Sequence, residues 1–536
     1  MSEPSDRSSA RRGKARKSQS SLGEQSLKAR VVKGGVYLTL RQLVSVGLSV
    51  VSVLVIARQL GTENYGILVN ALGIFYFVTW TGKLGLHAYL VQQQDLPEDA
   101  PEQVLAFFNV LSLGFAIALF FGAPGIGLWT GEPAVADLVR WLPLPIATEM
   151  IASVSVSMLE RNLAFAEVGF IEIFAQLANY LVAIPLVLLG WSYWGPMAGL
   201  CVRGIVTLAI AQYLFRVGWR WSWRWDFLRP ALRYGLTFSL SHWVMALRSL
   251  TLPVLVTPIA GAETAGLVSI AIRLVEQLST LRLVIRRMAM SVMAKLTDNA
   301  AAVRSTISRG MAYQALLVGV LCSVFACLDS WIVPILFGDE WIQSTHIFPL
   351  IALATMGRSM FDLHSGALYA VNRNAEVTKA YLLYIVLLWV GCAVLMPSLG
   401  RSGHALWGYG LAELLTIFSN VVLHRALAKI YGQPRYTTAL WLTLAAMMPI
   451  LGSLLSPIVG SVAFALSYSL VWLVPSVRAV PRDLISTFRQ RRSAKAAASE
   501  TVSDSVADSS APDSEPPESD SPDSDPKAAD LTSTPP

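Results

Sequence analysis

Residues 61–66 of the chain read GTENYG, and residues 261–266 read GAETAG. Each sextet joins two apolar runs, and the run before it covers residues 36–57 in the first copy and 236–256 in the second. Glycine begins and ends both sextets, and glutamate holds the third position of each. Two membrane-length apolar runs around such a turn predict a helical hairpin. Its recurrence predicts two related halves around a central space, a plan typical of transporters.

The composition indicates an all-α polytopic membrane protein. Of 536 residues, 54% are hydrophobic and 14% charged, and the mean hydropathy is +0.52. Open sheet edges cannot be satisfied in lipid, so strands are not expected. The four cysteines all lie in apolar runs, which favours buried small side chains over disulfides or metal ligands. We therefore expect no metal and no cofactor.

About fourteen segments are long and apolar enough to be transmembrane helices. They cover residues 36–57, 66–85, 104–128, 142–159, 168–189, 194–215, 234–256, 264–285, 311–328, 347–371, 380–399, 405–427, 439–455 and 459–474. Further matches between the halves, such as LWTGE at 128–132 with ILFGD at 335–339, predict two repeated six-helix lobes. The last two segments have no counterpart and are expected to be an addition.

This repeat predicts the domain organisation. It comprises a disordered basic cytoplasmic tail (1–33), an N-terminal six-helix lobe (34–215), an interfacial linker (216–232), a C-terminal six-helix lobe (233–430), two extra transmembrane helices (431–475) and a largely disordered, acidic cytoplasmic tail (476–536). Segment 216–229, RVGWRWSWRWDFLR, is expected to be an interfacial helix, because Trp and Arg suit the lipid headgroup region.

Cations gather in the even-numbered connections and in both tails, so the positive-inside rule predicts that both termini are cytoplasmic. The net charge of +7 therefore marks topology and does not indicate a nucleic-acid partner. The chain carries no phosphate-binding loop, nucleophile elbow or metal-ligand spacing, so an enzyme is not expected.

Ionisable residues inside the apolar segments are the candidate functional residues, because a charge at the bilayer centre needs water or a partner. Arg41, Arg248 and Arg273 lie in the first, seventh and eighth segments, and Arg282 follows two and a half turns after Arg273. If the halves face one another, these cations can converge on one cavity and favour an anionic ligand. Alternatively, each arginine snorkels or pairs locally.

Several other charged residues can be explained by local ion pairing or snorkelling, without a functional role. Glu276 can pair with Arg273 at i+3, and Arg358 with Asp362 at i+4. With His364, the latter two could instead form a polar cavity face or a proton relay. Snorkelling is the favoured interpretation for Lys83. Internal pairing is the favoured interpretation for three more residues: Glu172, Arg203 and Glu413.

Three segments resemble the polysaccharide-biosynthesis flippases of the multidrug/oligosaccharidyl-lipid/polysaccharide exporter superfamily. They are KGG at 33–35, ARQLGTENYG at 57–66 and ERNLAF at 160–165. The resemblance implies two six-helix lobes with alternating access. It also implies a cationic cavity lined by the first, second, seventh and eighth spans, and an undecaprenyl-pyrophosphate-linked glycan as substrate. The implied location is the bacterial inner (plasma) membrane.

Two other functions remain open. A small-molecule or drug antiporter of the same superfamily would favour a more acidic or apolar cavity, and a membrane glycan ligase would need large outer loops with carboxylates. Expected partners are the lipid-linked glycan, membrane lipids, and a polysaccharide polymerase with its export machinery.

Overall fold

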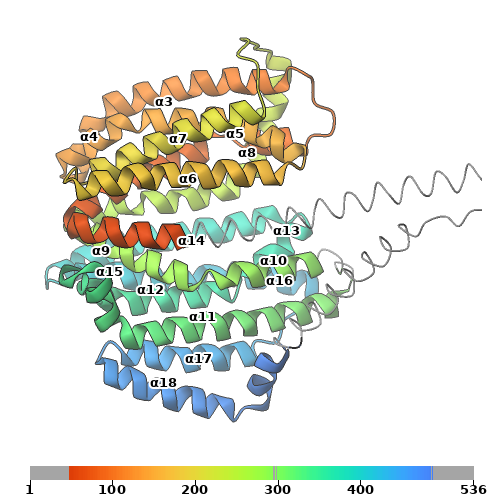
Figure 1. The fold of residues 1–536 in the computed structure, drawn as a ribbon. Coiled ribbons are helices and arrows are strands. Elements are labelled where there is room, and N and C mark those ends of the chain that lie inside the picture. The colour runs from red at the N-terminus through yellow and green to blue at the C-terminus, as the bar shows by residue number, and fades with distance from the viewer. Residues whose placement is uncertain (1–46, 294–295, 297–298, 484–485, 487–536) are drawn as a thin grey trace, which may run out of the picture. The chain divides into compact units, whose positions relative to one another are not determined.

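The computed structural model describes residues 47–293, 296, 299–483 and 486. The described residues up to Arg478 form one compact unit, and the few described residues from Ala479 onward belong to a second. The described part of the chain is helical and contains no strand (Figure 1). The predicted all-α class is confirmed. The predicted tail 1–33 and most of the tail 476–536, apart from 476–483 and 486, lie outside the described residues.

The N-terminal half of the first unit consists of a long first helix, Gly47–Gly82, and six numbered helices. These are α2 (Leu86–Gln92), α3 (Ala100–Thr130), α4 (Pro133–Trp141), α5 (Pro143–Arg161), α6 (Phe165–Leu188) and α7 (Trp194–Leu214).

The C-terminal half begins with a broken helix. It comprises α8 (Trp225–Ala246), a 3-10 turn (Leu247–Leu250), a π-helical turn (Leu252–Val256) and α9 (Thr257–Leu278). Its other helices are α10 (Leu281–Met293), α11 (Ala300–Phe337), α12 (Gln343–Ser359), α13 (Asp362–Ala370), α14 (Asn374–Gly400), α15 (Ala405–Leu415) and α16 (Asn420–Tyr431), with 3-10 turns at Asp339–Trp341 and Thr416–Ser419. Two last helices, α17 (Thr437–Gly452) and α18 (Pro457–Trp472), pack beside α11 (Figure 1).

The repeated sextets form the turns that the sequence predicts. Gly61 and Gly261 have φ values of 73° and 85°, a region that glycine enters without steric cost. At Gly61 the chain turns within Gly47–Gly82, and at Gly261 a backbone kink interrupts α9. Each copy of the repeat is therefore a hairpin with a glycine at its bend.

The two hairpins pack against each other reciprocally. A Cβ on Gly66 would lie 1.8 Å from the carbonyl oxygen of Ala262, and a Cβ on Gly266 would lie 2.2 Å from that of Thr62. Because Thr62 and Ala262 are equivalent positions of the repeat, the second glycine of each hairpin packs against the turn of the other hairpin. Such close backbone approach through small residues is typical of helix packing in membranes.

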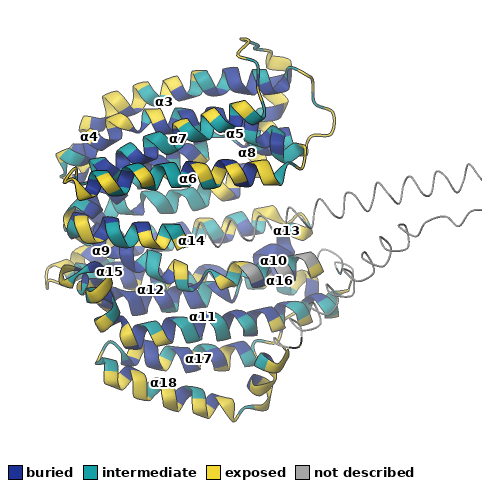
Figure 2. Ribbon diagram, in the orientation of Figure 1, coloured by how far each residue is buried: buried dark blue, intermediate teal, exposed yellow. Residues whose placement is uncertain are grey.

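Apolar clusters give each half its own core. One cluster lies in the N-terminal half around Phe108 and Ile146, and another in the C-terminal half around Phe348 and Tyr409. A third joins the halves, with Leu60 and Tyr65 packed against Leu267, Phe337 and Trp341 among others. Outward-facing residues of helices such as α3 and α18 are exposed and largely apolar (Figure 2). An apolar exterior of this kind suits lipid.

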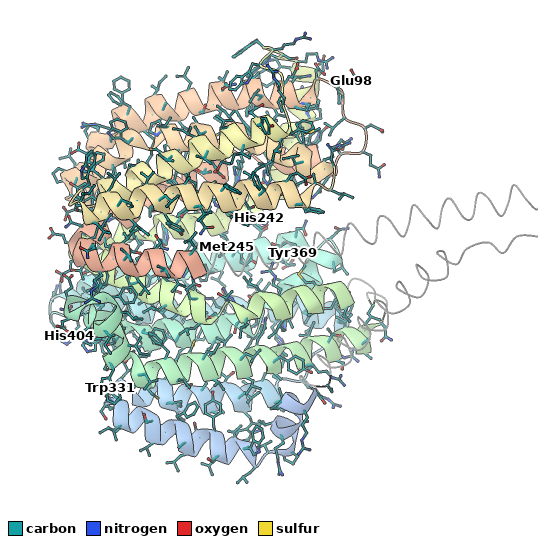
Figure 3. All side chains as sticks on the ribbon, in the orientation of Figure 1. Glu98, His242, Met245, Trp331, Tyr369 and His404 are labelled. Carbon is teal, nitrogen blue, oxygen red and sulfur yellow. The ribbon has the colours of Figure 1, made fainter. Side chains whose placement is uncertain are left out.

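Nine described helices are long and apolar enough to cross a membrane, or ten if the bent pair Pro457–Trp472 and Pro475–Asp483 is one span. The stretch Gly47–Gly82 counts as one of the nine although it turns at Gly61, and α17 is too short to be counted. The number fourteen therefore stays a prediction. Glu98, from a connection expected inside, lies at the opposite end of the helices from Trp331 and His404, which are expected outside (Figure 3).

The predicted interfacial helix over 216–229 is wrong for its first part. Residues 216–224 form no regular secondary structure, with an extended backbone at Arg224, and helix α8 begins only at Trp225. The alternation of Trp with Arg or Ser has the two-residue period of an extended chain, in which successive side chains point to opposite sides. Trp223 packs beside Phe107, while Arg224 and Ser222 both contact the Asp99 carboxylate.

Candidate functional site

A hollow of about 530 Å³ lies between the two halves. Tyr76 and Trp80 line it from the first helix, and Arg248 and Arg273 line it from the broken helix and α9. His242 and Met245, which also line it, project at the junction of the halves (Figure 3). We call this space the central hollow. It brings together two of the arginines that the sequence singles out.

Arg248 forms two ion pairs. Its Nη1 lies 3.2 Å from Oε1 of Glu276, and its Nη2 lies 3.3 Å from Oε1 of Glu413. Glu413 has a fully buried side chain that also accepts a hydrogen bond from Tyr409 Oη at 3.0 Å and contacts Arg358. Within the described residues, the buried Nε of Arg248 has no hydrogen-bond partner. The two terminal nitrogens of Arg248 are thus paired with carboxylates, and its Nε remains as a donor without a partner.

Arg248 lies where the helical backbone is irregular. The 3-10 turn Leu247–Leu250 contains it, and the π-helical turn Leu252–Val256, with Pro253, follows. Proline removes a backbone donor, and π-turns within helices frequently mark functional sites. The local sequence therefore sets Arg248 at a break in the helix, on the wall of the hollow.

The predicted pairing of Arg273 with Glu276 is wrong, because Glu276 binds Arg248 instead. Among the described residues, none forms a hydrogen bond or an ion pair with the Arg273 side chain. Arg273 nevertheless lines two hollows, the central one and another in the N-terminal half. It is a guanidinium available to a ligand.

A smaller hollow of about 200 Å³ adjoins Arg248 on its other side. Arg282, Arg286 and Arg358 line it together with Asp362. The intrahelical pair of Arg358 with Asp362 is not present, because the chain leaves the helix between Ser359 and Asp362 and the i, i+4 relation is lost. Instead Arg358 contacts Glu413, and Arg282 Nη1 lies 3.9 Å from Asp362 Oδ2.

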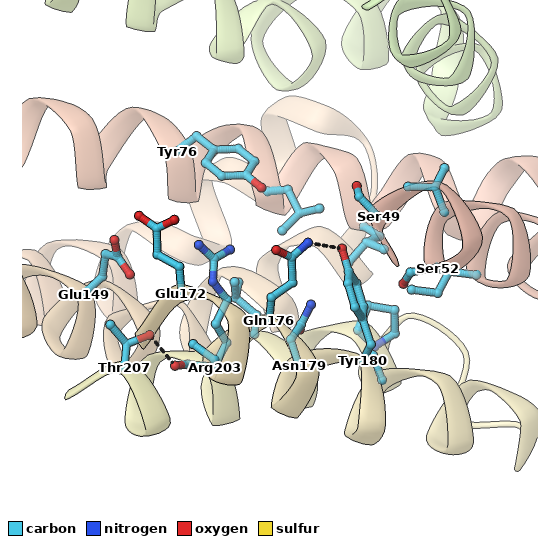
Figure 4. A pocket seen from close by; sticks show the side chains of 18 of the residues that line it. Ser49, Ser52, Tyr76, Glu149, Glu172, Gln176, Asn179, Tyr180, Arg203 and Thr207 are labelled. Atoms are coloured by element: carbon cyan, nitrogen blue, oxygen red, sulfur yellow. Dashed lines mark hydrogen bonds between the residues drawn. The ribbon is translucent and has the colours of Figure 1, made fainter. Parts of the chain in front are cut away.

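A third hollow, of about 510 Å³, lies in the N-terminal half (Figure 4). Glu172 and Arg203 line it, as does Glu149, which the sequence reasoning did not single out. Lys83 forms an ion pair with Glu149 at 3.3 Å, so it has a partner inside the protein, and its snorkelling stays a prediction. The signal for Glu149 was present as a lone carboxylate inside an apolar segment, which calls for a partner. We call this space the N-terminal hollow.

The other candidates lie elsewhere. Arg41 is outside the described residues. His364 Nε2 lies 2.8 Å from Tyr436 Oη, which also contacts His424 Nδ1 at 2.7 Å, so His364 belongs to a separate cluster. Over the described ranges, no group of three or more His, Cys, Asp or Glu side chains could hold a metal ion.

Residues 55–346, which make up more than half of the chain, match the protein family described as "Polysaccharide biosynthesis protein". The chain belongs to this family. Lipopolysaccharide biosynthesis protein WzxC of Escherichia coli (strain K12) is 21% identical over 439 residues, which is 80% of this chain and 87% of the relative. Succinoglycan biosynthesis transport protein ExoT of Rhizobium meliloti (strain 1021) is 29% identical over 171 residues, or 31% of this chain and 35% of the relative.

Solved transporter structures share the fold. The inward closed conformation of lipid II flippase MurJ covers 84% of this chain and 100% of its own, with 12% identity and a TM-score of 0.60. An inward-facing multidrug resistance MATE family transporter covers 74% of this chain and 99% of its own, with 14% identity and a TM-score of 0.57. The resemblance to polysaccharide flippases is confirmed, and the chain is a multi-pass membrane transport protein.

Proposed function

We propose that this protein translocates an undecaprenyl-pyrophosphate-linked oligosaccharide from the inner to the outer leaflet of a bacterial plasma membrane by alternating access. The observation that carries the proposal is Arg273, which lines the central hollow without a hydrogen bond or ion pair to any described residue. A guanidinium offers several donors in a planar fork that suits phosphate oxygens.

The charge of the hollows supports an anionic ligand. Five arginines line the central hollow and its smaller neighbour, whereas three carboxylates line or contact them, namely Glu276, Asp362 and Glu413. A formal excess of two positive charges favours a pyrophosphate over a cationic drug, because like charges repel at short range in a low-dielectric site.

The two-lobe fold supplies the movement. A pyrophosphate cannot cross the hydrocarbon core unaided, whereas the prenyl chain is soluble in it. With the headgroup on the arginines, the prenyl chain can stay in the bilayer while the halves rock about the seam between the hairpins. We also propose that both termini lie on the cytoplasmic side and that the glycan is delivered to a polymerase on the outer side.

Replacing Arg248 or Arg273 by Ala tests the proposal in cells that depend on this protein. Cell-surface polysaccharide should fall by about tenfold or more, and the lipid-linked glycan should accumulate inside, while the amount of protein in the membrane stays normal. Arg140, which pairs with Asp137 at an exposed site, provides the matched control. Normal export by both variants, with Arg140→Ala unchanged, would overturn the proposal.

A further inference from the structure

The N-terminal hollow has no role in the proposal above, although its volume of about 510 Å³ is close to that of the central hollow. Known small-molecule pockets span roughly 300–1,000 Å³. Helices α6 and α7 form one wall with Gln176, Tyr180 and Arg203, and Tyr76 of the first helix lies opposite (Figure 4). The space is therefore large enough for a ligand of more than one ring.

Amides and hydroxyls line this hollow together with apolar side chains. Gln176 Nε2 donates a hydrogen bond to Tyr180 Oη at 3.1 Å, and Asn179 lies beside them (Figure 4). Ser52 lines the same hollow, is 1% exposed, and has an Oγ without a hydrogen-bond partner among the described residues. A buried hydroxyl without a partner is costly, so Ser52 points to a ligand that satisfies it.

The charges of this hollow do not suit a bound cation. Lys83 forms an ion pair with Glu149, and Arg203 and Arg273 line the hollow with Glu172. Three cations thus accompany two carboxylates, whereas sites for metal cations carry an excess of oxygen ligands with negative charge. A ligand with many hydroxyl groups fits better, because each hydroxyl both donates and accepts hydrogen bonds. Sugars have this chemistry.

Arg273 connects the two spaces, since its side chain lines both the central and the N-terminal hollow. We propose that the N-terminal hollow binds the sugar residues next to the pyrophosphate, while Arg248 and Arg273 hold the pyrophosphate itself. This inference rests on the proposed function. It places the headgroup across the seam between the halves, with phosphate on the C-terminal side and sugar on the N-terminal side.

Two probe lipids separate sugar binding from phosphate binding. The purified full-length protein is titrated with undecaprenyl pyrophosphate and with undecaprenyl pyrophosphate that carries a single hexose. Wild type should bind the hexose-bearing lipid more tightly. The double substitution Ser52→Ala/Gln176→Ala should weaken that binding by about tenfold, since it removes two polar contacts, and leave the bare lipid unchanged. Ser52→Ala has no described hydrogen bond to lose, whereas Gln176→Ala loses the one to Tyr180, so unchanged binding of the bare lipid also shows that the double variant is folded.

Leu181→Ala is the matched control, because Leu181 lies on the same helix as Gln176 and is 72% exposed. Equal affinity of wild type for both lipids, or equal weakening of both by the double substitution, would overturn the sugar site. A double variant that keeps the hexose preference but loses a sodium or pH dependence of transport would also overturn it and indicate a cation site. Arg273→Ala should weaken both lipids; if it weakens neither, the proposed function itself fails.

Discussion

The Arg248 guanidinium forms ion pairs with two carboxylates, one buried and one half-exposed. Glu413, 3.3 Å from Nη2, is fully buried, whereas Glu276, 3.2 Å from Nη1, is 51% exposed at the central hollow. The inner pair is held by further contacts from Arg358 and Tyr409, and the outer pair is open to competition. Glu276 therefore occupies the place at which an anionic headgroup would meet Arg248.

Glu276→Gln should raise the affinity for undecaprenyl pyrophosphate by up to about fivefold, the equivalent of roughly 1 kcal/mol for a half-exposed ion pair. The reason is that the substitution removes the internal anion competing for Arg248. Titration of the purified protein with that lipid measures the effect. Glu263→Gln, an exposed change on the same helix, should leave affinity unchanged. A weaker affinity in Glu276→Gln would show that Glu276 supports the ligand site and does not compete with it.

Glu413→Gln should lower stability strongly, because two partly buried arginines lose the fully buried carboxylate that they share. Breaking a buried ion pair from one side typically costs about 3–5 kcal/mol. The unfolding midpoint of the detergent-solubilised protein should fall by several degrees. Adding Arg358→Met to the same variant should recover part of the loss, since it removes one uncompensated charge. An unchanged midpoint in the single variant would mean that water or lipid already compensates these charges.

Gly66→Ala and Gly266→Ala should each disturb the seam between the halves. The added Cβ would lie 1.8 Å from the Ala262 oxygen in one case and 2.2 Å from the Thr62 oxygen in the other, so backbone must move. Overpacking of this kind costs about 1–3 kcal/mol or more. Gly122 is the matched control for substitution by Ala, because a Cβ added there would meet nothing within 4 Å. Thermal unfolding in detergent compares the three variants, and similar midpoints would contradict the close approach.

The hairpins were predictable from sequence because their signal is local. The first glycine of each sextet has a positive φ at the bend, and the last glycine allows the two hairpins to pack closely. Both recur at equivalent positions of the repeat. The candidate arginines were predictable as residues, since any charge in an apolar segment is costly. That Arg248 and Arg273 share a hollow required the fold, which brings the 3-10 turn Leu247–Leu250 and α9 together.

The ion-pair partners were not predictable by spacing along a helix. Arg248 and Arg358 both contact Glu413, which lies 165 and 55 residues away in sequence. The break between α12 and α13 also separates Arg358 from Asp362, and no residue pattern near it announces the change. In segment 216–224 the two-residue alternation of Trp was visible in the sequence. Trp and Arg also suit an interfacial helix, however, so the sequence alone left both structures open. The contacts of Ser222 and Arg224 with Asp99 favour the non-helical one.

Asp99→Asn should release the segment 216–224 without unfolding the protein. Asp99 accepts hydrogen bonds from Gln103 at 2.9 Å and Ser222 at 3.2 Å, and it pairs with Arg224. Burial alone would raise the pKa of Asp99, but the Gln103 hydrogen bond, the Arg224 charge and the Ser222 hydrogen bond together hold this pKa below its ordinary value of 3.8.

Because the folded pKa of Asp99 is the lower one, these contacts are fully present above the ordinary pKa and are lost only as pH falls through the folded value. Quenching of tryptophan fluorescence by acrylamide should therefore increase in Asp99→Asn at pH 7, with no change in wild type between about pH 5 and 8. Neighbouring Glu98, an exposed residue, gives the control Glu98→Gln (Figure 3). Since exposed ion pairs contribute about 0–1 kcal/mol, the unfolding midpoint should hardly move. Unchanged quenching in Asp99→Asn would mean that stacking of Trp223 on its aromatic neighbours alone holds the segment.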